Sequence, residues 1–509
     1  MAAIGPTPPG VVTGVHAAAW IGRMARQLAD THQALDALDH AGGLDEQAGT
    51  CAWMTARAAA AAVADLHEAG DAAWVLDVAA SAALSHAQGA GGIVVAHVLA
   101  SAASAVADPS LTPVAFAQVL RATAQALPAC LVGAASTGGA LALMADTILD
   151  EVDTSVPELV STTLAEQAWV AAQSALIEAD TEVVDALAAV VVVMLGAAAD
   201  SDQTDAHSTV AQMLDDLAGG LTAPTPRPGR LRVDFTIEAD AATAERMRQR
   251  IEARGRGGVM AGLPDPFGFA TWVVSARTDT PFAIVTDQCR RVEVYTPTPL
   301  ELVEPQLDTG VVAFERPGAA MVSPAVIALT QARGIVEEVA MTGAHVCWGP
   351  DGWAGDLAAV VDRLAQPVVV IAPAGPKLDA LARSVRAQFA GTGTEVLVAP
   401  TADDLQVAQV AQSATAKVGA HLAADELARL QRSRIMRALE AVHTVVLDPH
   451  VALADVVSEH DRQVRVLLGA EGPGRNQIVA QLEAISPWLR LDIVPGDQPG
   501  PTVIGVVES

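Results

Sequence analysis

The stretches of this sequence that could carry chemistry are glycine-rich loops and a few pairs of ligand-type side chains. The segment 469–476, GAEGPGRN, is expected between a strand and a helix, where backbone N–H groups can face a phosphate. Pro473 removes one of those N–H groups, which favours an ordinary loop. The sequence has no Walker A loop, no G-x-S-x-G elbow and no H-E-x-x-H pair, so generic motifs identify no catalytic residue.

Ligand-type residues also occur as an isolated pair. His345 and Cys347 alternate along one expected strand and therefore share a face, a pattern that without further ligands is typical of a buried core. The other cysteines, Cys51, Cys130 and Cys289, are far apart in the sequence and no C-x-x-C pair exists. The spacing indicates neither a disulfide framework nor a clustered zinc site, and it fits a reducing cytoplasm.

The composition limits the class of protein to which this chain can belong. The chain has 509 residues, enough for three or four domains at about 150 residues each. Apolar residues make up 51% and aromatic residues 3%, which predicts helices packed closely on small side chains rather than a disordered chain. The net charge of −29 argues against nucleic acid and anionic membranes as partners.

The first part of the chain is predicted to be entirely helical. Residues 13–219 have helical periodicity, and residues 1–220 carry 25 acidic residues against four arginines and no lysine. Residues 219–229, GGLTAPTPRPG, form the best linker in the chain. The longest apolar run, 186–199, is too short to span a bilayer, and the N-terminus has no basic region of a signal peptide. We therefore expect a cytoplasmic protein without a membrane span.

After the linker the pattern changes to strands and helices. Strands at 231–237 and 269–275 around a helix at 241–253 predict a small α+β unit, in which 254–258, RGRGG, is expected to be a solvated turn. Further Val-rich strands alternate with helices, as in a parallel sheet, and are expected at 310–314, 344–347, 367–371 and 395–398. Ser323 and Pro324 favour a helix start. A helix at 423–442, strands at 464–469, 491–494 and 502–507, and a helix at 474–485 complete the expected tail.

Four segments resemble, in order, the loops of the dihydroxyacetone kinase L-subunit (DhaL) family, in the form found in the ATP-binding component of fatty acid kinase. Residues 37–51, ALDHAGGLDEQAGTC, align with A-L-N-x-F-P-x-P-D-G-D-T-G-T-N. Residues 86–97, HAQGAGGIVVAH, are similar to G-A-R-G-N-S-G-V-I-L-S-Q. Residues 136–143 and 183–190 resemble V-E-G-T-I-L-T-V and V-V-D-A-G-G-K-G. The resemblance continues downstream in residues 232–242, 368–380 and 465–508.

This resemblance implies a multidomain chain. It comprises an all-α DhaL-like helical barrel at 1–220, a small α+β middle domain at 230–305, and an α/β DegV-like region with a C-terminal α+β tail at 309–509. In the family, magnesium ions held by aspartates of the first loop carry ATP, and a partner protein presents the fatty acid. Membership would therefore imply an ATP-dependent kinase.

The first loop is altered at its metal ligands. Asp45 falls on the first aspartate of the family's pattern, but Gln47 replaces the second, and a neutral amide cannot bridge two cations. Asp39 stands at the family's asparagine. The resemblance leaves a vestigial magnesium site made of Asp39, Asp45 and Glu46.

The other loops keep only part of the nucleotide-binding pattern. Ala90 and Gly91 replace an Asn-Ser pair, and Leu187 and Ala188 replace paired glycines. The remaining candidate nucleotide-binding residues are Gly89, Gly91, Gly92, Gly138 and Asp185.

Two further sites of the family are also changed in this sequence. Where the family has zinc ligands, this chain has Arg232, Ser275 and Arg277, which are not usual zinc ligands. In the DegV-like region, Ala374 and Gly375 replace an Asn-Asn pair.

These losses predict a catalytically degenerate scaffold or regulatory relative of the fatty acid kinase component, a homodimer without a bound cofactor. One alternative is an active kinase of a small hydroxy compound or fatty acid, which would use ATP and magnesium. Another is a lipid or small-ligand binder, because the Ala-rich helices could enclose an apolar cavity. The resemblance also implies a lipid-presenting partner protein.

Overall fold

The structure is a computed structural model of the chain, and it divides into two compact units. The first comprises Met1–Arg230, Asp234–Ile284 and Pro297–Val303, and the second comprises Leu231–Val233, Val285–Thr296 and Glu304–Ser509. The structure describes residues 14–41, 47–66, 71–106, 119–124, 127, 131–132, 146–147, 150, 161–178, 184–199, 206–219, 230–296, 321–322, 324–353, 355–364, 366–419, 422–447, 453–458, 461 and 463–507. The predicted linker at 220–229 and the predicted strand at 310–314 lie outside these residues.

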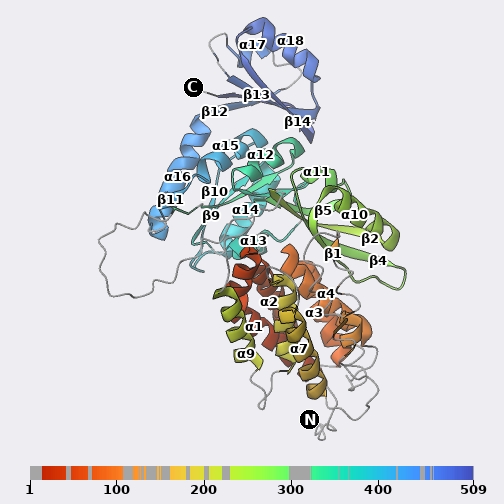
Figure 1. Ribbon diagram of the computed structural model, residues 1–509. Coiled ribbons are helices and arrows are strands. Elements are labelled where there is room, and N and C mark those ends of the chain that lie inside the picture. Colours follow the sequence, from red (N-terminus) through yellow and green to blue (C-terminus); the bar gives the residue numbers. More distant parts are fainter. Residues whose placement is uncertain are drawn as a thin grey trace. The chain divides into compact units, whose positions relative to one another are not determined.

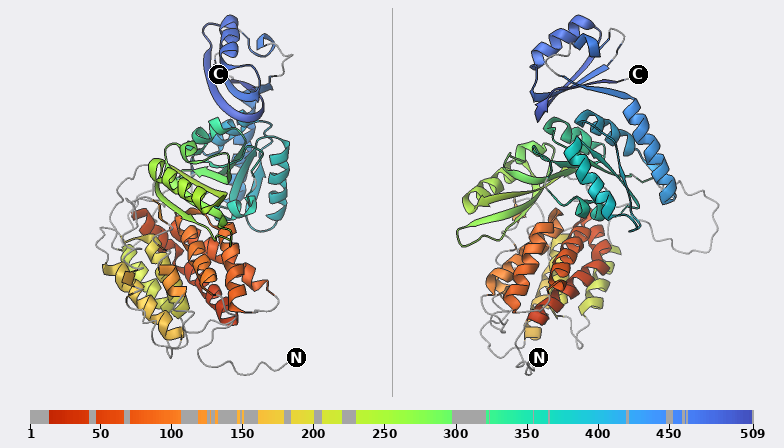
Figure 2. Two further views of the ribbon diagram at one scale, coloured as in Figure 1. Left: turned by 90° about the vertical axis from the view of Figure 1, so that its right-hand side faces the viewer. Right: turned by 180° about the vertical axis from the view of Figure 1, so that it is seen from behind.

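The first unit begins with a helical bundle (Figure 1). Its helices are α1 (Gly14–Ala41), α2 (Ala48–Ala64), α3 (Ala72–His86), α4 (Gly89–Ala105), α7 (Ser161–Glu178), α8 (Ala186–Ala199) and α9 (Ala206–Gly219). Helix α8 is buried along almost its whole length, because its residues are all Ala, Val, Leu, Met or Gly. Helices α1, α4, α7 and α9 pack against it. Figure 2 shows the bundle from two further sides. The prediction of a helical N-terminal region is confirmed, except that Leu131–Val132 form a short strand.

The bundle core is made mostly of small side chains, with a few polar anchors. Trp20 donates its indole N–H to the carbonyl of Met194 at 3.2 Å, and Arg23 donates to the carbonyl of Ala197 at 2.9 Å. Ala197 lies in the last turn of α8, where carbonyl groups lack helical partners, so Arg23 caps that end. Among the described helices, none is both long and apolar enough to cross a bilayer.

Strands complete the first unit. Its strands lie in the order β1 (Leu131–Val132), β3 (Arg256–Ala261), β4 (Phe269–Thr278) and β2 (Leu231–Asp240), with α10 (Ala241–Arg254) and α11 (Pro281–Ile284) beside them. Val259, Ala261 and Val273 join the same apolar core as the helices. The expected turn at 254–258 is wrong from Arg256 onward, because antiparallel pairing with β4 extends this Arg-Gly segment into a strand.

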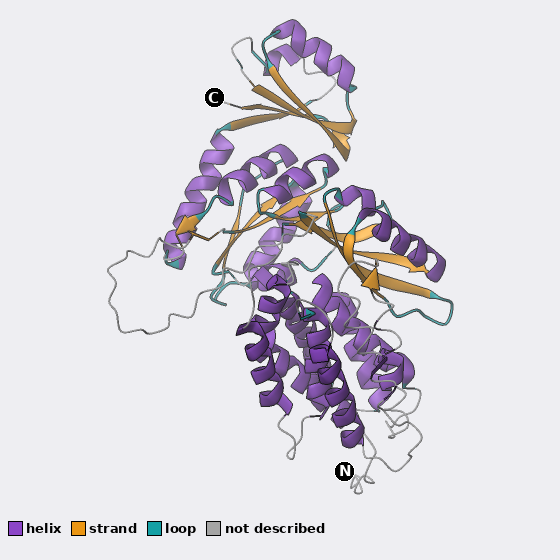
Figure 3. Cartoon of the chain, viewed as in Figure 1, coloured by secondary structure: helices purple, strands orange, loops and turns teal. Residues whose placement is uncertain are grey.

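The second unit contains a largely parallel sheet (Figure 3). Its strands lie in the order β5 (Cys289–Tyr295), β8 (His345–Trp348), β7 (Ala325–Thr330), β9 (Val368–Pro373) and β10 (Glu395–Val398). Strands β7 to β10 are mutually parallel, as predicted for the strands at 344–347, 367–371 and 395–398, and β5 pairs antiparallel with β8. The helix start expected at Pro324 is wrong: the fully buried strand β7 begins at the next residue.

Helices lie on both faces of this sheet. A short turn η1 (Arg333–Ile335) leads into α12 (Val336–Met341), which contacts α15 (Asp404–Ala414). On the other face, α13 (Leu357–Leu364) contacts α14 (Pro376–Gln388), as Figure 1 shows. The strand order β8-β7-β9-β10 with helices on two faces defines a doubly wound α/β layer.

The tail of the second unit is a separate α+β layer. A two-stranded ladder of β6 (Met321–Val322) and β11 (Val418–Gly419) precedes the long helix α16 (Ala424–Glu440). A four-stranded sheet follows in the order β12 (Val442–Val446), β15 (Val503–Val507), β13 (Gln463–Glu471) and β14 (Arg490–Pro501), with α17 (Leu453–Val456) and α18 (Arg475–Ile485). The predicted elements of the tail are confirmed to within a few residues, except that β14 is longer.

Candidate functional site

The first candidate loop lies where α1 ends and α2 begins. Asp39, a predicted magnesium ligand, accepts a hydrogen bond from the backbone N–H of Ala48 at 3.3 Å. Asp36, one helical turn earlier, accepts from the N–H and the hydroxyl of Thr50, at 3.0 and 2.5 Å. Two buried carboxylates on one face of α1 therefore satisfy N–H groups in the first turn of α2.

This arrangement replaces an ordinary cap on α2. The N-cap residue Gln47 is left-handed, with φ of 53°, and its side chain makes no capping bond in the described part of the chain. Burial raises the pKa of Asp36 despite the two bonds from Thr50. Asp36 was not predicted from the sequence, although its spacing of three from Asp39 places both on the same helix face.

The remaining predicted metal ligands, Asp45 and Glu46, lie outside the described residues, as does Gly138 of the third loop. Within the described ranges, no group of three or more His, Cys, Asp or Glu side chains is arranged to hold a metal ion.

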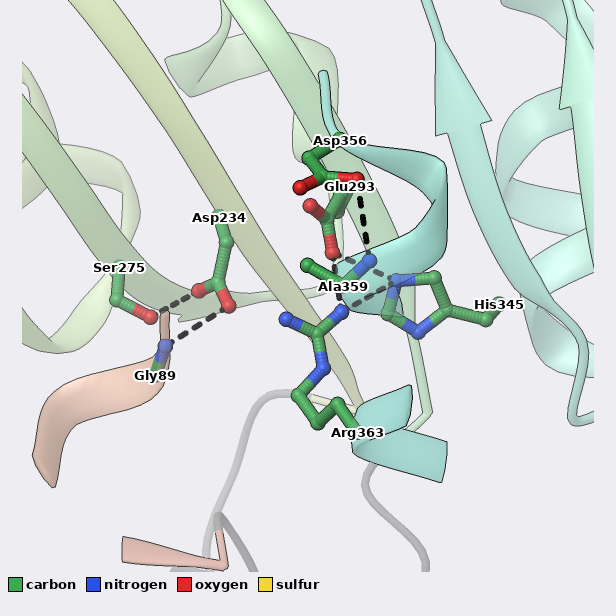
Figure 4. Close-up of polar contacts among 8 residues, drawn as sticks. All are labelled: Gly89, Asp234, Ser275, Glu293, His345, Asp356, Ala359 and Arg363. Carbon is green, nitrogen blue, oxygen red and sulfur yellow. Dashed lines mark hydrogen bonds and ion pairs between the residues drawn. The ribbon is translucent and has the colours of Figure 1, made fainter. Parts of the chain in front are cut away.

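The second candidate loop forms the start of α4. Gly89 has φ of 59° and donates its N–H to the carboxylate of Asp234 at 3.0 Å (Figure 4). Gly91 and Gly92 lie against α2: a Cβ at Gly91 would be 1.9 Å from the carbonyl oxygen of Ala48, and one at Gly92 would be 2.5 Å from the hydroxyl of Thr55. These two glycines therefore have a packing role, since only residues without a side chain allow the helices to approach so closely.

The fourth candidate loop forms the start of α8. Asp185 accepts hydrogen bonds from the N–H groups of Leu187 at 2.8 Å and Ala188 at 3.3 Å. This is the geometry of a helix N-cap. The side chains of Leu187 and Ala188 are buried in the bundle core.

The positions aligned with the family's zinc ligands are buried and polar. Ser275 donates its hydroxyl to the second oxygen of Asp234 and is fully buried, and Arg277 follows on the same face of β4. Arg232 is also fully buried. The Asp234 carboxylate therefore accepts hydrogen bonds from Ser275 and from Gly89. Asp234 was not predicted from the sequence, although it alternates with Arg232 and Thr236 on the polar face of the strand.

The carboxyl ends of the parallel strands hold a second polar group. Asp404, at the start of α15, accepts from the Thr330 hydroxyl and from the N–H of Gln331 at 3.3 Å. Burial raises the pKa of Asp404 to about 6, outweighing these bonds. Gly375 precedes α14 with φ of 87°, a backbone conformation that favours glycine.

A cluster of buried charged side chains lies in the second unit. Oε2 of Glu293 is 2.8 Å from Nε2 of His345 and 2.5 Å from Nη2 of Arg363 (Figure 4). Tyr295 stacks on the His345 ring with centroids 4.5 Å apart. Burial would raise the pKa of Glu293, but Arg363 and the His345 contact outweigh it and lower the pKa to about 2.

The same cluster explains why the Cys347 thiol stays protonated. Its thiol is fully buried, and burial together with the charge of Glu293 raises its pKa well above the ordinary value. A thiol that stays protonated and out of solvent is not a nucleophile. The interpretation of His345 and Cys347 as core residues is confirmed.

Comparison with known proteins adds no relationship. No protein-family model matches the chain, and no curated protein matches it either.

Proposed function

We propose that this chain is a catalytically degenerate DhaL-type protein, related to the ATP-binding component of fatty acid kinase, that works as a scaffold or regulator rather than as a kinase. The observation that supports this most directly is the use of the candidate loop residues. In the described part of the chain, the polar groups of these loops bond to the chain itself: Asp39 to α2, Asp185 to α8 and the N–H of Gly89 to Asp234.

Phosphoryl transfer requires these groups for the nucleotide. A triphosphate needs cations or N–H donors that neutralise and fix its oxygens, and carboxylates that hold magnesium. A carboxylate oxygen that accepts a hydrogen bond from a backbone N–H has fewer lone pairs for a metal. An N–H that donates its hydrogen to an aspartate cannot donate it to a phosphate. The acidic residues of 1–220 would also repel ATP.

The proposal includes a homodimer in the cytoplasm, without a bound cofactor, and a protein partner. Several large apolar side chains are exposed and could serve such contacts, including Trp488, with 91% of its surface exposed, and Phe267, with 86%. Light scattering of the purified protein measures the oligomeric state directly.

Calorimetric titration of the full chain with magnesium ATP tests the central proposal. We expect no binding in the micromolar range. The active-kinase alternative predicts micromolar binding that Asp45→Ala abolishes, and that result would refute the proposal.

A further inference from the structure

The start of α4 needs an acceptor that its own sequence does not supply. The first N–H groups of any helix lack partners within the helix. The residue before α4 is Gln88, in extended conformation, and the next four are Gly89, Ala90, Gly91 and Gly92. None of these four has a side chain that could accept a hydrogen bond, and the Gln88 side chain makes no capping bond to the helix.

The acceptor is an anion from a distant strand. Oδ2 of Asp234, on β2, accepts the N–H of Gly89 at 3.0 Å across 145 positions of sequence. Oδ1 of the same carboxylate accepts the hydroxyl of Ser275 on β4. Figure 4 shows both bonds converging on one side chain. Asp234 is thus held from two elements, and only 4% of its surface is exposed.

An anion in this position is electrostatically favoured. The N-terminus of a helix carries a partial positive charge that stabilises carboxylates and phosphates alike. Helix α4 packs against β3 and β4, which brings its start to the strand layer that carries Asp234 and Ser275. Arg277, on the same face of β4 as Ser275, buries a cation in that layer.

We propose that the carboxylate of Asp234 is an internal anion that occupies the start of α4 and excludes phosphate groups from it. A phosphate oxygen would compete with Asp234 for the Gly89 N–H, and two anions at one helix terminus repel each other in a buried setting. This inference rests on the proposed function and deepens it: the chain supplies its own substitute for a phosphate, with Ser275 as the residue that positions it.

The test removes the internal anion and offers a phosphate. Full-length wild-type protein, Asp234→Ala and Asp234→Asn are titrated with pyrophosphate, without divalent metal, by calorimetry. We expect both variants to bind pyrophosphate at least about ten-fold more tightly than wild type, because both lose a like charge and Asp234→Ala also releases the Gly89 N–H. Hydrogen exchange of peptides covering 86–95 should increase in the variants and decrease again with pyrophosphate.

The matched control is Asp240→Ala. Asp240 lies at the end of the same strand and caps α10 by accepting the N–H of Thr243 at 2.7 Å. Its removal uncaps a helix without creating a pyrophosphate site. An equal gain in Asp240→Ala, or no gain in a folded Asp234 variant, would overturn the inference. Asp234→Asn keeps the side-chain shape, so it decides the matter if Asp234→Ala does not fold.

The two proposals fail in different ways. Micromolar binding of magnesium ATP to the wild type contradicts the proposed function, whatever the pyrophosphate affinities of the Asp234 variants are. If the wild type and both Asp234 variants bind no phosphate compound, the internal-anion inference is wrong and the degenerate-kinase proposal stands.

Discussion

Arg363 and Glu293 form a buried ion pair in which Nη2 of the guanidinium lies 2.5 Å from Oε2 of the carboxylate. Arg363 comes from α13 and Glu293 from β5, so the pair joins a helix to a strand of the sheet. Both side chains are more than nine-tenths buried. Because neither charge can be rehydrated in place, each depends on the other, and on the contact of Glu293 with His345.

Glu293→Gln should be strongly destabilising. The change leaves the Arg363 charge buried without its counter-ion, and we expect a loss of about 3 kcal/mol in the free energy of unfolding by urea. The matched control is Arg383→Gln, which breaks an exposed pair with Asp379 at 2.8 Å. That change should cost less than about 1 kcal/mol. Equal losses would mean that burial of the Glu293 pair has no energetic consequence.

The contribution of Glu293 should also depend on pH in a defined window. Its pKa in the folded chain is about 2, below the ordinary value of 4.5. The stabilisation is therefore present above pH 4.5 and is lost as the pH falls towards 2. We expect the stability difference between wild type and Glu293→Gln, measured by urea unfolding from pH 7 downwards, to stay constant to about pH 4.5 and then to shrink. A constant difference down to pH 2 would contradict the assignment.

Asp404 should show the opposite dependence. Its pKa is raised from 3.8 to about 6, so the folded chain binds its proton more tightly than the unfolded chain does. This group therefore destabilises the fold above pH 6, and the penalty disappears as the pH falls to 4. Asp404→Asn keeps an oxygen acceptor for Thr330 and should stabilise the protein by about 3 kcal/mol at pH 7, with almost no gain at pH 4. Thermal unfolding at both pH values measures this.

The sequence was sufficient for the elements whose pattern is local. Strand β10 was predicted at its observed bounds, because a Val-rich run flanked by turns leaves little choice. Strand β3 was missed because Arg256, Gly257 and Gly258 look like a turn, and only pairing with β4 makes them a strand. Strand β7 was missed because a serine followed by proline marks a helix start as well as the residue before a strand.

The contacts of the candidate site residues were harder to predict from the sequence, because they depend on the fold. The sequence predicts that Asp39 and Asp185 lie at loops. Whether each binds a ligand or caps a helix depends on which N–H groups the fold brings within 3.3 Å. The bond between Gly89 and Asp234 joins residues 145 positions apart, and no local pattern encodes it.

Gly91→Ala should destabilise the bundle. A Cβ there would lie 1.9 Å from the Ala48 carbonyl oxygen, a backbone atom that cannot move without separating α2 from α4. We expect a loss of about 3 kcal/mol, measured by urea unfolding. Gly22→Ala is the control, since its Cβ would meet only the end of the Arg26 side chain at 3.7 Å. An alanine inside α1 should instead stabilise by roughly 0.5 to 1 kcal/mol.

The variant Asp185→Ala tests whether Asp185 caps a helix or binds a nucleotide. If Asp185 serves only to accept the N–H groups of Leu187 and Ala188, its removal should lower the free energy of unfolding by about 1 to 2 kcal/mol. Titration with magnesium ATP should give the same blank result before and after the change. Asp71→Ala is the matched control, because Asp71 caps α3 through the N–H of Trp74 at 2.7 Å and lies outside every candidate loop.

The two cap variants should therefore behave alike in both measurements. A cap at either helix start satisfies the same kind of N–H group, so similar losses of stability with no change in ATP titration support a structural role for Asp185. If magnesium ATP raises the melting temperature of wild type and Asp71→Ala, but not of Asp185→Ala, then Asp185 contacts the nucleotide. That result would favour the active-kinase alternative, because stabilisation by a ligand requires a site that binds the folded chain.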